Sequence, residues 1–164
     1  MNRADLTLGP LSEQDHVFYG LVWAGTTLAA EVDRALTRRH GLALSWFEVM
    51  LWLNGQREPV ASSDLGAKTM LSRSQVSRVV DALAARGLVH RTPSATDARS
   101  VRIELTEQGR AAFAEADATR RAVLAPLFTD RLDEGDIAAL EAVWRKLKQP
   151  PRPTAPGPAA PPAG

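Results

Sequence analysis

The chain of 164 residues contains no cysteine and only three histidines. Without a thiol, neither a disulfide nor a sensor that depends on a reactive cysteine is available. The histidines, His16, His40 and His90, lie far apart in the sequence, and no thiolate is present to join them around zinc. We therefore expect no metal site and no cofactor.

Long apolar runs are also missing. No segment approaches the ~18 consecutive apolar residues of a membrane span. The first fifteen residues are polar and acidic where a signal peptide would have its apolar centre. We expect a cytoplasmic protein without a membrane partner, and the length predicts one domain with a substantial core.

The sequence shows no arrangement typical of catalysis. The three histidines fall in separate predicted elements, and no glycine-rich phosphate loop is present. We do not expect an enzyme.

Net charge is small but unevenly distributed. The whole chain carries +1, whereas residues 60–106 hold seven basic and four acidic side chains, a local excess of +3. The basic residues are Lys68, Arg73, Arg78, Arg86, Arg91, Arg99 and Arg102, and the acidic ones are Asp64, Asp81, Asp97 and Glu104. This excess favours a nucleic-acid partner whose binding is sensitive to salt.

Residues 71–87 predict a short amphipathic helix. Ser72 and Gln75 have the spacing of a capping box, Leu71 has the position of a hydrophobic staple, and Gly87 ends the helix. One face is apolar with helical periodicity: Val76, Val79, Val80 and Leu83. The opposite face carries hydroxyl and charged groups: Ser74, Ser77, Arg78 and Asp81, with Arg73 beside them.

The polar face suits a DNA groove, because small side chains permit close approach while longer donors reach base edges. We expect five side chains to face the major groove: Arg73, Ser74, Gln75, Ser77 and Arg78. Arg78 is the expected reader of a guanine. A phosphate contact is the alternative for either arginine, and a solvated surface is the alternative for the whole face.

Two β-prone segments follow, at 88–91 and 101–105, joined by a turn-rich stretch. The tip of this hairpin holds Asp97 and Arg99. An arginine there can enter a narrow minor groove. We expect Asp97 to pair with Arg99, or with an arginine on a neighbouring strand, and to orient it. Helix and hairpin together predict a winged helix-turn-helix that binds double-stranded DNA.

Four short runs, in this order and spacing, resemble the MarR family of bacterial transcriptional regulators. They are Val76–Leu83, Arg86–Val89 with Arg91, Asp97–Arg99, and Leu105–Gly109. The resemblance extends over about residues 15–148. It implies a homodimeric repressor that binds a pseudo-palindromic operator and is released by a small, often aromatic, ligand.

The expected fold is mainly α with a small β-wing. Helices are predicted at 12–39, 44–54, 64–69, from Thr106 to about 125, and from Asp133 onward. The helix at 44–54 is apolar nearly all round, with Ser45 as its expected cap, and should lie at the centre. At the start of the last helix, Asp133 and Asp136 have the three-residue spacing that supports a helix cap at Asp133.

We predict a single MarR-like domain over residues 1–148. The winged-helix lobe spans 44–106, and the helices at 12–40 and 107–148 form a dimerisation region. The apolar stripes of the first and last helices could instead close a monomeric core. Residues 149–164 hold seven of the eleven prolines, which predicts a disordered tail, a proline-rich docking motif being the alternative.

Other candidates depend on less specific signals. Three serines are candidates for phosphate contacts or only for helix caps: Ser45, Ser62 and Ser63. Four residues are candidates to line an effector pocket, although Trp and Tyr on apolar stripes are more often core: Tyr19, Trp23, His40 and Trp46. The alternative function is a winged-helix module that binds proteins, without ligand control, because the fold alone does not fix function.

Overall fold

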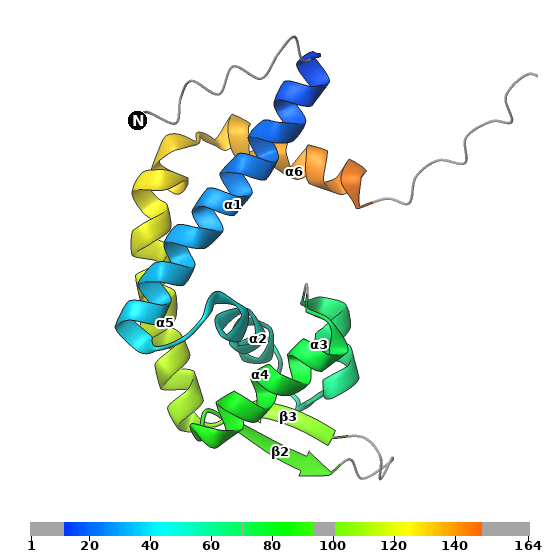
Figure 1. Ribbon diagram of the computed structural model, residues 1–164, viewed down its shortest axis with the longest axis vertical. Helices are drawn as coiled ribbons and strands as arrows, with labels where there is room; N and C mark the ends of the chain where they lie inside the picture. The colour runs from blue at the N-terminus through cyan, green and yellow to red at the C-terminus, as the bar shows by residue number, and fades with distance from the viewer. Residues whose placement is uncertain (1–11, 70, 94–100, 149–164) are drawn as a thin grey trace, which may run out of the picture.

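The computed structural model describes residues 12–69, 71–93 and 101–148. Two long helices, α1 (Glu13–His40) and α5 (Glu107–Leu127), run side by side along the long axis (Figure 1). One end of this pair carries α2 (Leu44–Asn54), α3 (Ser62–Lys68), α4 (Arg73–Ala85) and the strands. The other end carries α6 (Glu134–Leu147), which follows a short 3₁₀ turn, η2 (Thr129–Arg131). The predicted mainly α fold with a β-wing is confirmed.

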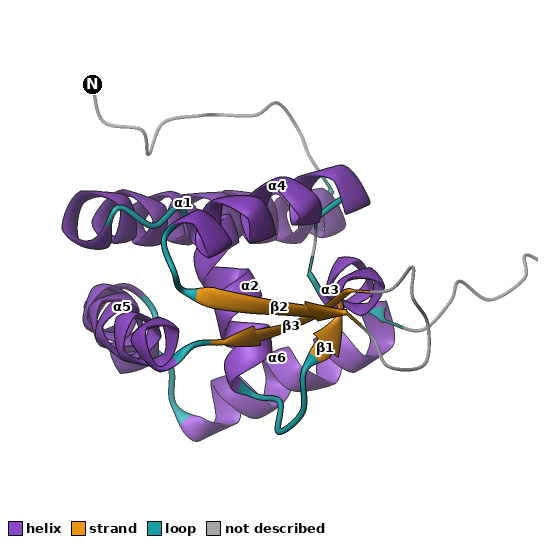
Figure 2. Cartoon of the chain, turned by 90° about the horizontal axis from the view of Figure 1, so that it is seen from below, coloured by secondary structure: helices purple, strands orange, loops and turns teal. Residues whose placement is uncertain are grey.

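The sheet has three antiparallel strands in the order β1 (Val60–Ala61), β3 (Val101–Leu105), β2 (Val89–Pro93). The expected hairpin is formed by β2 and β3, and α5 lies at the end of it where β3 stops (Figure 2). Strand β1, which pairs Val60 with Ile103, was not predicted, because two residues are too few to show alternation.

The core lies where α2, α4 and the sheet meet α1 and α5. The rings of Phe47 and Phe113 stack with centroids 5.4 Å apart. The apolar face predicted for α4 is buried throughout: Val76, Val79, Val80 and Leu83. The prediction that α2 is central is right for one face only, because Leu51 and Trp52 are exposed.

Local signals predicted most helix ends correctly. Capping boxes are present at α1 (Ser12 and Asp15), α4 (Ser72 and Gln75) and α6 (Asp133 and Asp136). The Thr106 side chain accepts a hydrogen bond from the amide of Gly109 at the start of α5. Each of these helices therefore begins where its own sequence directs.

One predicted cap and two predicted helix ends were wrong. Helix α2 spans the predicted residues, but Ser45 does not cap it; the cap comes from α1, where Asp33 Oδ1 accepts the Leu44 amide at 2.7 Å. Helix α3 begins at Ser62 rather than at residue 64. Helix α5 continues through Pro126, because in the last turn a proline removes only one hydrogen bond and Phe128 N still reaches Leu124 O at 2.8 Å.

The apolar stripe of α6 does not close a core within the chain. None of the residues of α6, all of which the structure describes, is buried. The large apolar side chains of the first half of α1 are exposed as well, Trp23 by 64%. The monomeric-core alternative is therefore wrong. Over the described ranges, no helix is both long and apolar enough to cross a membrane.

Candidate nucleic-acid interface

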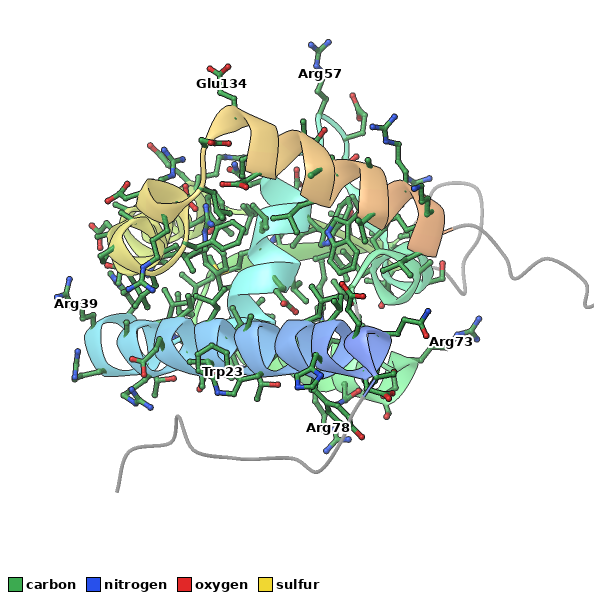
Figure 3. The ribbon with its side chains drawn as sticks, turned by 90° about the horizontal axis from the view of Figure 1, so that it is seen from above. Trp23, Arg39, Arg57, Arg73, Arg78 and Glu134 are labelled. Carbon is green, nitrogen blue, oxygen red and sulfur yellow. The ribbon has the colours of Figure 1, made fainter. Side chains whose placement is uncertain are left out.

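The five side chains predicted to face DNA are all exposed on α4: Arg73, Ser74, Gln75, Ser77 and Arg78. The buried stripe of the helix packs against α2, α3 and β2, so the opposite face is directed away from the protein. Figure 3 shows Arg73 and Arg78 extending outward beyond the helices. The helix therefore presents cationic and hydroxyl groups to whatever approaches it.

The N-terminal turn of α4 is ordered by its own side chains. Ser72 N donates to Gln75 Oε1 at 2.8 Å, and Ser72 Oγ lies 3.1 Å from Ser74 Oγ. The side-chain oxygen of Gln75 is thus already bonded within the cap. Arg78 Nε donates to Ser74 O at 3.4 Å, which directs the side chain back along the helix.

An ion pair joins α4, the second helix of the helix-turn-helix and the expected recognition helix, to the wing formed by β2 and β3. Arg91 of β2 donates from Nη2 to Asp81 Oδ1 of α4 at 2.6 Å. Both side chains are partly exposed, so the pair adds only ~0–1 kcal/mol to stability. The pair balances the acidic charge of Asp81 and connects the start of the wing to the helix.

The base of the wing is held by another arginine. Arg102 of β3 donates from Nη1 to the carbonyl of Pro59 at 2.9 Å, which fastens the hairpin to the segment before β1. Asp97 and Arg99, the predicted tip residues, lie outside the described residues, so their roles stay predictions. Neither of the contacts of Arg91 and Arg102 could be predicted from the sequence, since neither arginine is near its partner in the chain.

The three candidate serines lie on two helices. Ser62 opens α3 half-buried, and Ser63 beside it is exposed and directs Oγ to Asp64 Oδ1 at 3.4 Å. Neither caps α3, whose preceding residue is Ala61. Ser45 is half-buried in the first turn of α2. Their phosphate contacts stay predictions.

The four residues proposed for an effector pocket are not brought together within the chain. Tyr19 and Trp23 are exposed in the first half of α1. His40 Nε2 lies 2.8 Å from Thr119 Oγ1 on α5. Trp46 faces the guanidinium of Arg86, 5.8 Å from the ring centroid.

A cavity of about 280 Å³ lies instead between α1, α2 and α5. Its lining is apolar except for one arginine: Leu28, Ala29, Val32, Leu44, Arg120, Leu124 and Phe128. Arg120 donates to the buried Asp117 at 2.7 Å, and Arg121 bonds the same carboxylate. Burial raises the pKa of Asp117, but the hydrogen bonds and charges of the two arginines outweigh it and hold the pKa below its usual value. Arg121 is largely exposed, so Asp117 chiefly offsets the charge of Arg120, and the otherwise aliphatic and aromatic lining suits a largely apolar molecule.

These features define a class of protein. A helix-turn-helix made of α3 and α4, a three-stranded wing, and a polar face with two arginines on the second helix are those of a winged helix-turn-helix DNA-binding protein. The family model described as MarR family matches residues 40–100, which include α2, α3, α4 and the strands β1 and β2. Over the matched residues the chain is similar to the MarR family of transcriptional regulators.

Similar proteins extend the match beyond that unit. An uncharacterized HTH-type transcriptional regulator of Bacillus cereus is 25% identical over 138 residues, 82% of this chain and 91% of its own length. CouR from Rhodococcus jostii, solved with p-coumaroyl-CoA, is 26% identical with a TM-score of 0.71, covering 83% of this chain and 94% of its own. Sco3205 from Streptomyces coelicolor, solved in complex with DNA, shares the fold at a TM-score of 0.79 and 22% identity, over 90% and 94% of the two chains.

Proposed function

We propose that the protein is a sequence-specific, homodimeric repressor that binds a pseudo-palindromic operator. The observation that carries the proposal is the exposed face of α4, where Arg73 and Arg78 flank serine hydroxyls on a helix held rigidly by its buried stripe. Small hydroxyls allow the helix to approach the floor of a major groove, and arginine is the commonest side chain to read guanine. A surface for protein partners would present apolar anchors instead.

Dimerisation is supported by two apolar faces that no described residue covers. The face on α6 comprises Ile137, Leu140, Val143, Trp144 and Leu147. The face on α1 comprises Val17, Phe18, Leu21 and Val22 with Tyr19 and Trp23. Apolar surface of this extent usually marks a protein contact, and both faces lie at the end of the molecule remote from the sheet (Figure 1). A second copy that covered them would leave both recognition helices exposed.

The dimer would place two copies of α4 in successive major grooves on one side of DNA, about 10 bp apart. We assign the major-groove contacts to the five polar residues of α4 and the minor-groove contact to Arg99, with Asp97 orienting it. Phosphate contacts are assigned to Ser45, Ser62 and Ser63. The winged-helix lobe is residues 44–106 of a single domain, 1–148; the predicted disordered tail, 149–164, lies outside the described residues.

Replacing Arg78 by alanine should weaken operator binding by about 1–3 kcal/mol, and most at the base pair that it reads. Replacing Arg99 should weaken binding to operators with A·T-rich flanks. The probe is the duplex recovered by in vitro selection with the wild-type protein, and affinity is measured by fluorescence anisotropy at fixed salt.

The charge-matched control is Arg39→Ala, because Arg39 lies in the last turn of α1 and points outward (Figure 3). This variant should bind as wild type does. If Arg78→Ala and Arg99→Ala also bind normally, the assignment of contacts is wrong. If selection with the wild type recovers no duplex, the DNA-binding proposal itself fails, and this result would favour the alternative of a winged-helix module that binds proteins.

We further propose that a small aromatic or amphipathic molecule releases the protein from DNA. The support is the apolar cavity between α1, α2 and α5, which touches both the dimerisation helices and the DNA-binding lobe. CouR, a similar protein, was solved with an aromatic acyl thioester. A panel of phenolic compounds should include one that raises the melting temperature and lowers operator affinity. A panel that changes neither quantity contradicts ligand control by this class of compound.

A further inference from the structure

Arg86 lies at the end of the recognition helix but is directed at α1. It is the C-cap residue of α4, and its guanidinium donates from Nη1 to Gly41 O at 2.8 Å and from Nη2 to His40 O at 3.1 Å. The same guanidinium is 5.8 Å from the centroid of Trp46, at the start of α2. One side chain thus joins the C-terminal ends of α4 and α1, which are 45 residues apart in sequence.

The two carbonyls are part of the end of α1. Gly41, with φ of 62°, turns the chain so that its amide reaches Leu36 O and Thr37 O. The carbonyls of His40 and Gly41 follow this turn and receive their donors from Arg86. The C-terminal end of a helix carries partial negative charge, so a guanidinium is well suited to this position.

The segment that follows Arg86 is held from the other side by α5. Thr106 Oγ1 donates to Gly87 O at 2.7 Å, and Thr106 N donates to Leu88 O at 3.1 Å. Residues 86–88, which we call the anchor loop, are therefore fixed between the end of α1 and the start of α5. Both of those helices run on toward the end that carries the exposed apolar faces (Figure 1).

We infer that Arg86 is a positioning residue for DNA recognition: it fixes the direction of α4 relative to α1 without itself contacting DNA. The inference rests on the proposed function. In a dimer held through α1 and α6, the direction of α4 in each copy sets the separation of the two recognition helices. That separation determines which distance between half-sites the protein accepts.

The test compares the wild type with Arg86→Ala, Arg86→Lys and the charge-matched Arg39→Ala. Affinity is measured on the selected operator and on versions with the half-sites moved closer or farther by one and two base pairs, each over a range of salt. Arg86→Ala should lose most of the preference for the native spacing, about tenfold in the ratio of affinities, because two hydrogen bonds from a charged donor are lost. Arg86→Lys, which keeps the charge and can bond these carbonyls, should recover part of it.

A contact between Arg86 and phosphate would act differently. It would lower affinity equally at every spacing and reduce the slope of log affinity against log salt by about one, which would overturn the inference. An unchanged spacing preference in Arg86→Ala would overturn it as well. If Arg86→Ala fails to fold, the test depends on Arg86→Lys. The inference is contradicted if this variant has the same spacing preference as the wild type and amide exchange over residues 36–42 is no faster than in the wild type. Failure of the wild type to select any duplex would instead refute the proposed function.

Discussion

Replacing Gly109 by alanine is expected to lower the free energy of unfolding by about 3 kcal/mol. A Cβ atom at this position would lie 1.9 Å from the carbonyl oxygen of Leu88 and 2.9 Å from its carbon. These are backbone atoms of the anchor loop, and the same oxygen already accepts the amide of Thr106. No rotation of a side chain relieves the overlap, so α5 and the loop must separate and break the contacts between them.

Thermal denaturation of the two proteins at equal concentration measures the effect, since the stability of a dimer depends on concentration. Gly66→Ala is the matched control, because it makes the same exchange inside helix α3, where the nearest atom to a new Cβ is 3.9 Å away. That control should leave the melting temperature unchanged or raise it slightly, as alanine favours helix by up to ~1 kcal/mol. Equal melting temperatures for Gly109→Ala and wild type would show that the junction accommodates a methyl group.

The recognition helix could be predicted from sequence because its determinants are local. The bonds of the capping box span three residues, and the buried stripe repeats every three or four. The same holds for Thr106 at the start of α5 and for Asp133 at the start of α6. Where the hydrogen-bonding groups at a helix end find partners within a few residues, the sequence alone is enough to locate that end.

The contacts that orient α4 could not be predicted, because their partners are distant in the chain. In the sequence, Asp81 is not distinguishable from the other polar residues of α4. It forms an ion pair with Arg91 only because the fold places β2 beside α4. The cap of α2 comes from Asp33, eleven residues before Leu44, so the prediction of a cap at Ser45 is wrong. Arg86 gives no sequence signal of its contact with α1, since an exposed arginine at a helix end is common.

The cavity was missed for a related reason. Its lining is mostly aliphatic, and aliphatic residues on amphipathic helices predict burial without distinguishing a filled core from a hollow. The aromatic side chains of Tyr19 and Trp23, predicted to line a pocket, are exposed on α1. The apolar stripe of α6 was equally ambiguous. Helical periodicity indicates that one face becomes buried, but it does not show whether that face packs against the same chain or against a second chain.

Trp144→Ala is expected to convert much of the dimer to monomer at micromolar concentration. Trp144 is the largest side chain of the exposed α6 face and is 59% exposed in the single chain. A tryptophan buried at the centre of an interface contributes about 2 kcal/mol or more to association, which corresponds to at least a thirtyfold weaker dimer. Sedimentation equilibrium of the wild type and the variant measures this change directly.

Arg145→Ala is the control, because Arg145 is exposed on α6 and no residue of the apolar stripe lies three or four positions before or after it. It should leave the dimer intact. Operator affinity should fall for Trp144→Ala and not for Arg145→Ala, since a monomer engages only one half-site, while binding to an isolated half-site should stay unchanged in both. A Trp144→Ala protein that remains fully dimeric would exclude this face of α6 from the interface. The dimer that sets the distance between the recognition helices would then have to form through α1 alone.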